Sequence, residues 1–286
     1  MSIFSKLSTL FSMVAYKLGK KGHYRSKNIY DFTCSQKKIV VVVPSYNNEK
    51  WCLKNLDSLR NQKYENFHVI YINDNSTDKT GEMVQRYIKE HRLEKKFTLI
   101  NNAERLGALE NQYNAVHSCA NDSIVTLVDG DDQFAHPDVL NIINSMYQDP
   151  NIWLTYGQFR VFPGGKIWKC TTFSSDTIEK NDFRKTPFIV SHLRTFYAGL
   201  FKLIKKEDLF YDGKFFEMTG DRAAMAPLIE MTGGKFAYIS DILYLYNNEN
   251  PINDHKVDIA LQHKLNAVIM NKRPYKPVQW NDIVNV

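Results

Sequence analysis

Residues 123–132 read SIVTLVDGDD, an apolar run that ends in three carboxylates around one glycine. The apolar part has the length and composition of a buried strand, so the acidic cluster stands at its carboxyl end. Side chains two residues apart in an extended segment point the same way, so we expect Asp129 and Asp131 to share one hard metal ion. Gly130 would let a phosphate approach the backbone, and Asp132 follows directly. The stretch therefore predicts a strand whose end binds a metal and a nucleotide diphosphate.

Strand-like and helix-like segments alternate around this stretch, from residue 37 onward. Short apolar runs typical of strands occupy Lys38–Val43, Phe67–Ile72 and Phe97–Ile100, and the segments between them show helical spacing. Four strand–helix repeats predict an α/β fold, in which a mostly parallel, Rossmann-like sheet lies inside a three-layer α/β/α sandwich. A smaller and less regular half follows along the chain.

This second half carries weaker signals. A hairpin is predicted around residues 162–165 (FPGG), and two further strands are expected at Phe236–Ile239 and Ile242–Tyr246. Pro187–Leu203 is rich in aromatic residues. It would either line the acceptor side of a site or form an amphipathic helix whose apolar residues belong to the core.

The net charge of +6 is concentrated at the amino terminus. Six of the 37 basic residues and none of the 31 acidic residues precede Asp31, so the remaining chain has as many basic as acidic residues. A nucleic-acid-binding surface needs a basic face on the folded domain and is therefore not expected. Four cysteines lie far apart without zinc-binding spacing, which indicates neither a disulfide framework nor a structural zinc site. A reducing, cytoplasmic location fits this pattern.

Residues 4–21 form a separate feature. Apolar residues recur there at steps of three and four, which predicts a basic amphipathic helix. It is too short and too interrupted for a transmembrane span, and no signal-peptide cleavage site follows it. The helix would either lie peripherally on an anionic membrane surface, or pack on the domain or fray; both interpretations stay open. We assign residues 1–36 to this amino-terminal segment.

Polar loops follow the predicted strands, and in parallel sheets such loops meet in one ligand-binding crevice. They contain Pro44-Ser45-Tyr46-Asn47, Asn73-Asp74-Asn75-Ser76, residues 101–107 and the acidic cluster. None of them has the glycine pattern of dinucleotide-binding or P-loop proteins. A metal ion, rather than a nest of backbone amides, is therefore expected to neutralise the phosphates.

A resemblance rests on four segments: VVVVPSYNNE at 40–49, YINDNSTDKT at 71–80, NNAERLGALEN at 101–111 and VTLVDGDDQF at 125–134. Together they resemble the nucleotide-binding half of family-two glycosyltransferases of GT-A fold, closely over residues 38–135 and more loosely to about residue 250. The resemblance implies a GT-A domain over residues 37–250, with a nucleotide-binding half at 37–135 and an acceptor half at 136–250. Residues 251–286 would form a C-terminal loop, helix and tail.

The resemblance implies roles for the loop residues of the nucleotide-binding half. Pro44, Ser45 and Tyr46 would hold the nucleoside, with the Tyr46 ring free to stack on the base. Asp74 would accept a hydrogen bond from uracil, and Arg105 would approach the base or the diphosphate. As structural alternatives, Asp74 would cap the following helix and Arg105 would pair with a surface acid.

In the acidic cluster, the resemblance implies that Asp129 touches the ribose and shares the metal, Mn²⁺ or Mg²⁺, with Asp131. Gly130 would lie against the donor, and Asp132 would support its neighbours on the sugar side. Many GT-A enzymes close the site with a C-terminal loop, and some supply a histidine to the metal. His255 would take that part or else face solvent.

Asp221 is the candidate general base. It heads a predicted helix that ends at Gly233-Gly234, where this family places its base, although Gly220 replaces the second acid often found before it. A plain helix cap is the alternative. His192 and Arg194 would lie on the donor-sugar or acceptor side.

With these residues, the resemblance implies a metal-dependent, inverting glycosyltransferase of the hexosyltransferase class. It would move a sugar from a nucleotide diphosphate, most often UDP in this family, to a hydroxyl group of a glycan, lipid or protein. A sugar nucleotidyltransferase and a non-catalytic GT-A-like binding module are the alternatives. The first needs a glycine-rich, arginine-containing loop that the Pro44–Glu49 turn lacks, and the second would have lost acids that this chain keeps.

Overall fold

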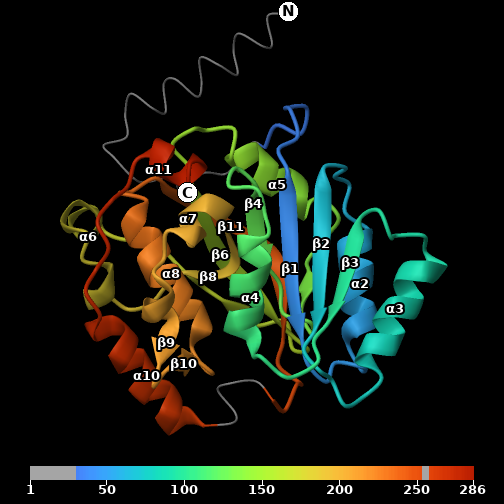
Figure 1. Cartoon of the computed structure of the whole chain (residues 1–286). Helices are drawn as coiled ribbons and strands as arrows, with labels where there is room; N and C mark the ends of the chain where they lie inside the picture. The colour runs from blue at the N-terminus through green and yellow to red at the C-terminus, as the bar shows by residue number, and fades with distance from the viewer. Residues whose placement is uncertain (1–29, 253–257) are drawn as a thin grey trace, which may run out of the picture.

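The computed structural model of the chain describes residues 30–252 and 258–286 (Figure 1). The amphipathic helix predicted within residues 4–21 and the candidate metal ligand His255 lie outside the described residues. Among the described residues, no helix is both long enough and apolar enough to cross a membrane. The described part contains every other candidate site residue.

Strands and helices alternate through residues 37–135, the predicted nucleotide-binding half, as expected. The elements are β1 (Ile39–Ser45), α2 (Cys52–Arg60), β2 (Phe67–Asn73), α3 (Thr80–Glu90), β3 (Phe97–Asn101), α4 (Ala108–His117) and β4 (Ile124–Leu127). The strands are parallel and lie in the order β3-β2-β1-β4. All seven residues of β1 are buried, as a continuous apolar run requires of a strand covered on both faces.

The second half extends the same sheet. Its elements are β5 (Gln133–Phe134), α5 (Val139–Met146), β6 (Leu154–Phe162), β7 (Ile167–Trp168), α6 (Ser175–Lys180), η1 (Phe183–Lys185), β8 (Ser191–Tyr197), α7 (Ala198–Lys202), η2 (Lys206–Leu209), β9 (Phe210–Tyr211), β10 (Lys214–Phe215), α8 (Gly220–Met231), β11 (Phe236–Asn247), α10 (Ile259–Asn271) and α11 (Trp280–Val284). Strand β7 pairs antiparallel with β6, which confirms the predicted hairpin.

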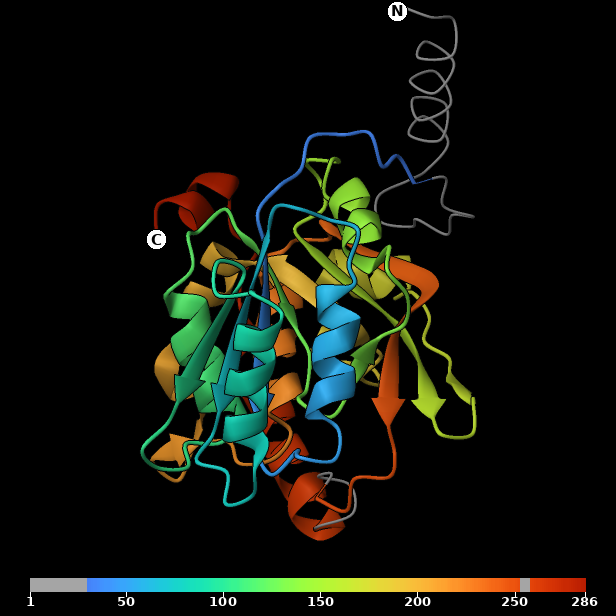
Figure 2. The same cartoon turned by 90° about the vertical axis from the view of Figure 1, so that its right-hand side faces the viewer.

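The predicted three-layer arrangement is confirmed. Helices α2 and α3 lie on one face of the sheet, and α4 covers the other together with α7 and α8 (Figures 1 and 2). Side chains from both faces and from the sheet form one continuous apolar core. Burial of this core on both sides explains why β1 carries no polar side chain before Ser45 at its end.

The direction of the strands decides where a ligand can bind. Strand β8 runs antiparallel to both β4 and β6, and β11 runs parallel to β6. Strands β4, β6 and β11 therefore run the same way, and so do β1, β2 and β3. The carboxyl ends of six strands thus lie along one edge of the sheet, where loops of open α/β sheets bind ligands.

Two expectations for the second half are corrected. The helix considered for Pro187–Leu203 is wrong for residues 191–197, which form β8 between β4 and β6, and right only for Ala198–Lys202, which form α7. Thr195, Phe196 and Tyr197 suit a strand; Thr195 and Phe196 pair with both β4 and β6, and Tyr197 pairs with β4. The two strands expected at 236–246 are one strand, β11, whose register shifts near Ile242.

A buried ion pair fixes the C-terminal segment to the domain. Arg184 donates to both carboxylate oxygens of Glu230 on α8, at 2.5 and 3.0 Å, and also to the carbonyl oxygen of Ile269 on α10. The backbone N–H of Tyr275 donates to the same carboxylate at 2.9 Å. One acid therefore holds η1, α8 and the chain after α10 together, and α10 supplies Gln262 to the site described next.

Candidate active site

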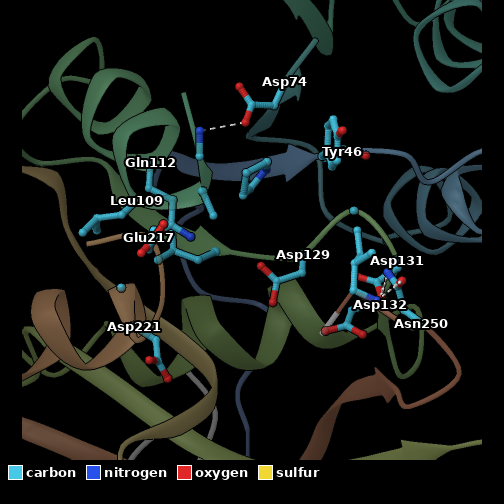
Figure 3. Close-up of a pocket in the computed structure, with 18 of the residues that line it drawn as sticks. Tyr46, Asp74, Leu109, Gln112, Asp129, Asp131, Asp132, Glu217, Asp221 and Asn250 are labelled. Carbon is cyan, nitrogen blue, oxygen red and sulfur yellow. Dashed lines mark hydrogen bonds between the residues drawn. The ribbon is translucent and has the colours of Figure 1, made fainter. Parts of the chain in front are cut away.

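A cavity of about 340 Å³ opens at the carboxyl edge of the sheet. Its lining brings together twelve predicted site residues: Pro44, Ser45, Tyr46, Asp74, Arg105, Asp129, Gly130, Asp131, Asp132, His192, Arg194 and Asp221. In the view of Figure 3, Asp131 and Asp221 lie on opposite sides of Asp129, which points into the cavity. Residues that are far apart in the sequence thus surround one space.

The acidic cluster forms a turn instead of an extended segment. The N–H of Asp132 donates to the carbonyl oxygen of Asp129 at 3.0 Å, because the chain reverses at Gly130 and Asp131 after β4 ends. The expectation that Asp129 and Asp131 point the same way as alternate residues of a strand is therefore wrong. Both carboxylates still line the cavity, because the turn itself stands at its wall.

Gly130 is needed for a close contact within the protein. A Cβ atom at this position would lie 2.4 Å from Ser45 Oγ and 2.8 Å from Asn48 Nδ2. The Gly130 N–H also donates to the carbonyl oxygen of Pro44 at 3.1 Å. The glycine therefore lets the turn pack directly on the end of β1, which brings the acidic cluster and the predicted nucleoside loop together.

Asp131 is held by amides that come from the far end of the chain. Asn250 Nδ2 donates to Asp131 Oδ2 at 2.8 Å, and Asn247 Nδ2 lies 3.5 Å from the same oxygen. Both asparagines follow or end β11, next to the acidic turn. The segment after β11 therefore orients the Asp131 carboxylate at the cavity wall.

Asp132 is buried and supports this arrangement. Its two carboxyl oxygens accept from the Tyr244 hydroxyl and from the Asn247 N–H, each at 2.6 Å. Burial, followed by the charges of Asp131 and Asp129, raises the pKa of Asp132 well above its usual value, although these two hydrogen bonds act in the opposite sense. With 1% of its surface exposed, Asp132 fits the supporting role better than direct contact with a sugar.

Side chains of the predicted nucleoside loop already contact other residues of the protein. The Ser45 hydroxyl accepts from Tyr71 at 2.9 Å and from Asn48 at 3.0 Å, so it holds the loop in place. The Arg105 guanidinium carbon lies 3.9 Å from the centroid of the Tyr46 ring. The expectation of a free Tyr46 ring is therefore wrong for one of its faces, because a cation–π contact covers it.

Asp74 organises the loop between β3 and α4. Its carboxylate accepts from Asn102 Nδ2 at 2.8 Å, from the Leu106 N–H at 2.9 Å and from the Gly107 N–H at 2.8 Å. It therefore braces the start of α4 and does not cap the helix after Asn75, as the structural alternative supposed. Burial alone would raise the pKa of Asp74, but the hydrogen bonds outweigh it and lower the pKa.

We expect Asp74→Asn to lower the free energy of unfolding at neutral pH by about 1.5–3 kcal/mol, because an amide NH₂ would face buried donors. The pKa of Asp74 is lower in the folded state than in the unfolded state, where it is about 3.9. Its carboxylate therefore stabilises the fold above about pH 3.9, and this stabilisation is lost as pH falls through the folded-state pKa. Urea unfolding should therefore show a difference between wild type and variant that narrows below about pH 4. The exposed Asp122→Asn is the control, and an equal loss in both variants would contradict this account.

Asp221 lies in the first turn of α8, but it is not the helix cap. Thr219 is the N-cap residue and has φ of 58°, which is strained for a β-branched side chain. Arg194 Nη2 donates to Asp221 Oδ2 at 2.7 Å, and the Arg222 N–H donates to Oδ1. A Cβ atom on Gly220 would lie 3.0 Å from Leu109 Cβ, so contact with α4 disfavours a side chain where the family often has a second acid.

The Arg194–Asp221 ion pair has an asymmetric environment. The Arg194 side chain is 9% exposed and that of Asp221 is 41% exposed. Arg194 also donates to the carbonyl oxygen of Val190 at 3.0 Å, which fixes the guanidinium beneath the carboxylate. The buried Arg194 thus holds the Asp221 carboxylate in place, while the carboxylate remains open to the cavity.

His192 lines the cavity as a neutral ring. It stacks on Tyr244 with ring centroids 4.3 Å apart, and its buried Nδ1 has no hydrogen-bond partner among the residues that the structure describes. Burial first, and then the charge of Arg194, lower the pKa of His192 well below its usual value. Its neighbours in the sheet therefore keep an uncharged imidazole beside the acidic residues.

This environment predicts a pH dependence of stability. The folded state binds a proton at His192 less readily than the unfolded state does. The free energy of unfolding therefore decreases as pH falls below about 6.5, by at most about 1.4 kcal/mol per pH unit. His192→Phe should remove this contribution, so urea unfolding between pH 5 and 7 should show a smaller slope for the variant. Identical slopes would show that His192 titrates normally in the folded protein.

The donor atoms around the acidic turn fit a hard divalent metal. No group of three or more His, Cys, Asp or Glu side chains gathers as a metal site in the part of the chain that the structure describes. Asp129 and Asp131 nevertheless provide carboxylate oxygens in one cavity, and Mg²⁺ is commonly held by one or two carboxylates, water and substrate phosphates. Carboxylates also suit Mn²⁺.

Several residues that line the cavity were not predicted from the sequence. Glu217, Gln112 and Gln262 face the cavity, and so do Asn48 and Asn250. Glu217 stands four residues before Asp221 and is a second acid on the same side of the cavity (Figure 3). Its position in an irregular segment gave no helical or strand period that would have marked it.

Comparisons with known proteins agree with this geometry. The model of the family described as glycosyl transferase family 2 matches residues 40–210. Glycosyltransferase GlyG of Streptococcus pneumoniae is 26% identical over 229 residues, which cover 74% of this chain and 71% of that protein. The chain spans only 13–28% of the length of several other glycosyltransferases that it matches.

Solved structures show the same fold at lower identity. TarS of S. aureus, in complex with UDP-GlcNAc, superposes with a TM-score of 0.59 at 17% identity over 86% of this chain and 70% of that chain. The mannosyltransferase PcManGT of Pyrobaculum calidifontis, in complex with GDP-Man and Mn²⁺, gives 0.58 at 20% identity over 93% and 73%. The GT-A fold is thus confirmed. Because the family model covers more than half of the chain, the protein belongs to glycosyl transferase family 2 and is a glycosyltransferase.

Proposed function

We propose that the protein is a metal-dependent, inverting glycosyltransferase that uses a UDP-sugar as donor and an acceptor hydroxyl group on a glycan, lipid or protein. The observation that carries this proposal is a single cavity lined by carboxylates from two separate elements, the turn after β4 and helix α8. Asp129 and Asp131 lie on a rigid turn after β4, and Asp221 lies on α8 with its own arginine. Transfer to a hydroxyl needs both a site for a charged leaving group and a separate base.

Asp129 and Asp131 would hold Mn²⁺ or Mg²⁺ together with the donor diphosphate. Such an ion, when bound, supplies positive charge that stabilises the nucleotide diphosphate as it leaves. Asn250 and Asn247 would keep the Asp131 carboxylate oriented, and buried Asp132 would anchor the segment that carries them. PcManGT, whose structure contains Mn²⁺ with its donor, supports this choice of metal. His255 remains a candidate further ligand.

The nucleoside would lie against Pro44, Ser45 and Tyr46, with Asp74 at the base. Arg105 would place a positive charge beside the Tyr46 ring, where the base or the diphosphate enters the cavity. The hydrogen bonds that Asp74 accepts fix the position of its carboxylate before a ligand arrives. TarS binds UDP-GlcNAc in a protein of this fold, which supports uridine as the first base to test.

Asp221 would accept the proton of the acceptor hydroxyl as the new glycosidic bond forms. One displacement by the activated hydroxyl breaks the bond between the anomeric carbon and the diphosphate oxygen, so the configuration inverts. Arg194 would keep the carboxylate in position, and neutral His192 would offer a hydrogen-bonding ring to the sugar side. No covalent sugar–enzyme intermediate is needed.

The roles that the sequence predicts for the segments of the chain are part of this proposed function. Residues 37–135 would bind the nucleotide and residues 136–250 the acceptor. Residues 251–286 would form a C-terminal loop, helix and tail, and residues 1–36 a basic amphipathic amino-terminal segment. A cytoplasmic protein at a membrane surface would meet nucleotide sugars directly. We place the chain there as part of the proposal.

A donor panel tests this function. Purified protein is incubated with Mn²⁺ and, in turn, UDP-, GDP- and dTDP-sugars, and released nucleotides are separated by chromatography. We expect UDP release from at least one UDP-sugar, little release in the presence of EDTA, and inverted anomeric configuration in any transfer product by NMR. Release of pyrophosphate, or a product with retained configuration, would refute the proposal.

A further inference from the structure

The β6–β7 hairpin, residues 160–169, exposes an unusual combination of side chains. Phe162, Ile167 and Trp168 are 38%, 37% and 55% exposed. The exposed cations of the hairpin are Arg160, Lys166 and Lys169. No acidic residue occurs between Phe159 and Ser175, and none of the three cations forms an ion pair with another described residue.

We propose that this hairpin docks the protein on a membrane surface that contains anionic lipids. Tryptophan favours the boundary between lipid tails and head groups, and apolar neighbours add buried area there. Lysine and arginine next to such residues are attracted to anionic head groups. The hairpin presents both features on one small, exposed element.

The hairpin is built rigidly enough to present these residues. The Trp168 ring stacks on Phe159, with centroids 6.0 Å apart and planes at 5°. The Val161 N–H donates to the Lys166 carbonyl oxygen at 2.7 Å across the turn. Trp168 is therefore held against a ring of the sheet while much of it stays exposed, and little side-chain order must be gained on docking.

The position of the hairpin agrees with a docking role. It follows the carboxyl end of β6, which lies at the same edge of the sheet as the cavity, and it projects beside the end of β11 (Figure 2). The Asn248 N–H donates to the Phe162 carbonyl oxygen at 2.8 Å, two residues before Asn250 of the cavity wall. Lys54 at the start of α2 lies 5.6 Å from the Phe162 ring and adds a fourth cation. Docking here would bring the mouth of the cavity to the membrane surface.

A vesicle assay tests this inference on the full chain. Co-sedimentation is measured with vesicles of phosphatidylcholine alone and of phosphatidylcholine with phosphatidylglycerol in equal parts. One variant, Lys166→Glu/Lys169→Glu, reverses the hairpin charges, and another, Ile167→Ser/Trp168→Ser, removes its apolar residues. The matched control, Lys89→Glu/Lys95→Glu, makes the same charge change at exposed lysines in and after α3. Thermal unfolding checks that all variants fold.

We expect wild type and control to bind the anionic vesicles alike, and each hairpin variant to bind about tenfold more weakly. Binding is measured without nucleotide sugar, so its outcome is independent of the proposed transfer reaction. Equal binding by all four proteins would assign any membrane contact to another segment and overturn the inference, as would no binding by wild type. Unchanged vesicle binding with a raised KM for a soluble glycan acceptor would assign the hairpin to the acceptor instead.

Discussion

Asp221→Asn is expected to lower kcat for sugar transfer by about 10²–10⁴-fold, because the variant lacks the carboxylate that we propose accepts the proton of the acceptor hydroxyl. The amide oxygen of the new side chain can still accept from Arg194, so the geometry of the site should survive. The KM for the donor should change little, since Asp221 lies away from the acidic turn in the cavity (Figure 3). Steady-state kinetics at saturating acceptor, with donor binding by calorimetry, measure both quantities.

Glu217 provides the matched comparison, because it is the other acid on that side of the same cavity. Glu217→Gln removes one negative charge, as Asp221→Asn does, but Glu217 precedes the helix and forms no ion pair with an arginine in residues 30–252 or 258–286. A small effect of Glu217→Gln beside a large effect of Asp221→Asn supports Asp221 as the base. The reverse pattern would transfer the role to Glu217 and show that the family resemblance selected the wrong acid.

Asp131→Asn is expected to lower kcat by about 10²–10³-fold, comparable to the loss of one preorganised group that stabilises developing charge. The loss should be larger at low Mn²⁺ concentration, because one of the two carboxylates proposed to hold the ion is gone. A Mn²⁺ titration of UDP-sugar turnover, repeated with Mg²⁺, separates weaker metal binding from a slower chemical step.

Asp122→Asn is the control for this substitution, because Asp122 is an exposed aspartate that does not line the cavity. Melting temperatures of both variants exclude unfolding as a cause of lost activity. Full activity of wild type in EDTA, together with an unchanged rate for Asp131→Asn, would show that the acidic turn has another purpose.

The fold of residues 37–135 agrees closely with the prediction from the sequence. Its strands are short apolar runs that end in polar loops, and burial on both faces leaves a strong signal of that kind. The segment 191–197 did not follow, because β8 joins two parts of the sheet that are distant in sequence. Its pairing with β4 and β6 depends on tertiary contacts, which override the local pattern around His192 and Arg194.

The membership of the site was easier to predict than its internal contacts. Loops at the carboxyl edge had to meet, so the cavity contains Asp74, Asp129 and Asp221 as expected. The contact of Arg105 with Tyr46 and the bond from Asn250 to Asp131 were not foreseen. Such contacts depend on side-chain reach between loops, which no sequence spacing encodes.

The central position of β8 limits how this enzyme can move. Thr195 on β8 shares hydrogen bonds with the hydroxyl groups of Thr155 on β6 and Tyr147 after α5, at 2.6 and 2.9 Å, while the β8 backbone pairs with β4. A hinge between the two halves would have to break a continuous sheet at its middle. Opening to admit a donor and release products must therefore come from the loops around the cavity. Turnover is expected to follow the rearrangement of these short connecting segments instead of the swing of one lobe against the other.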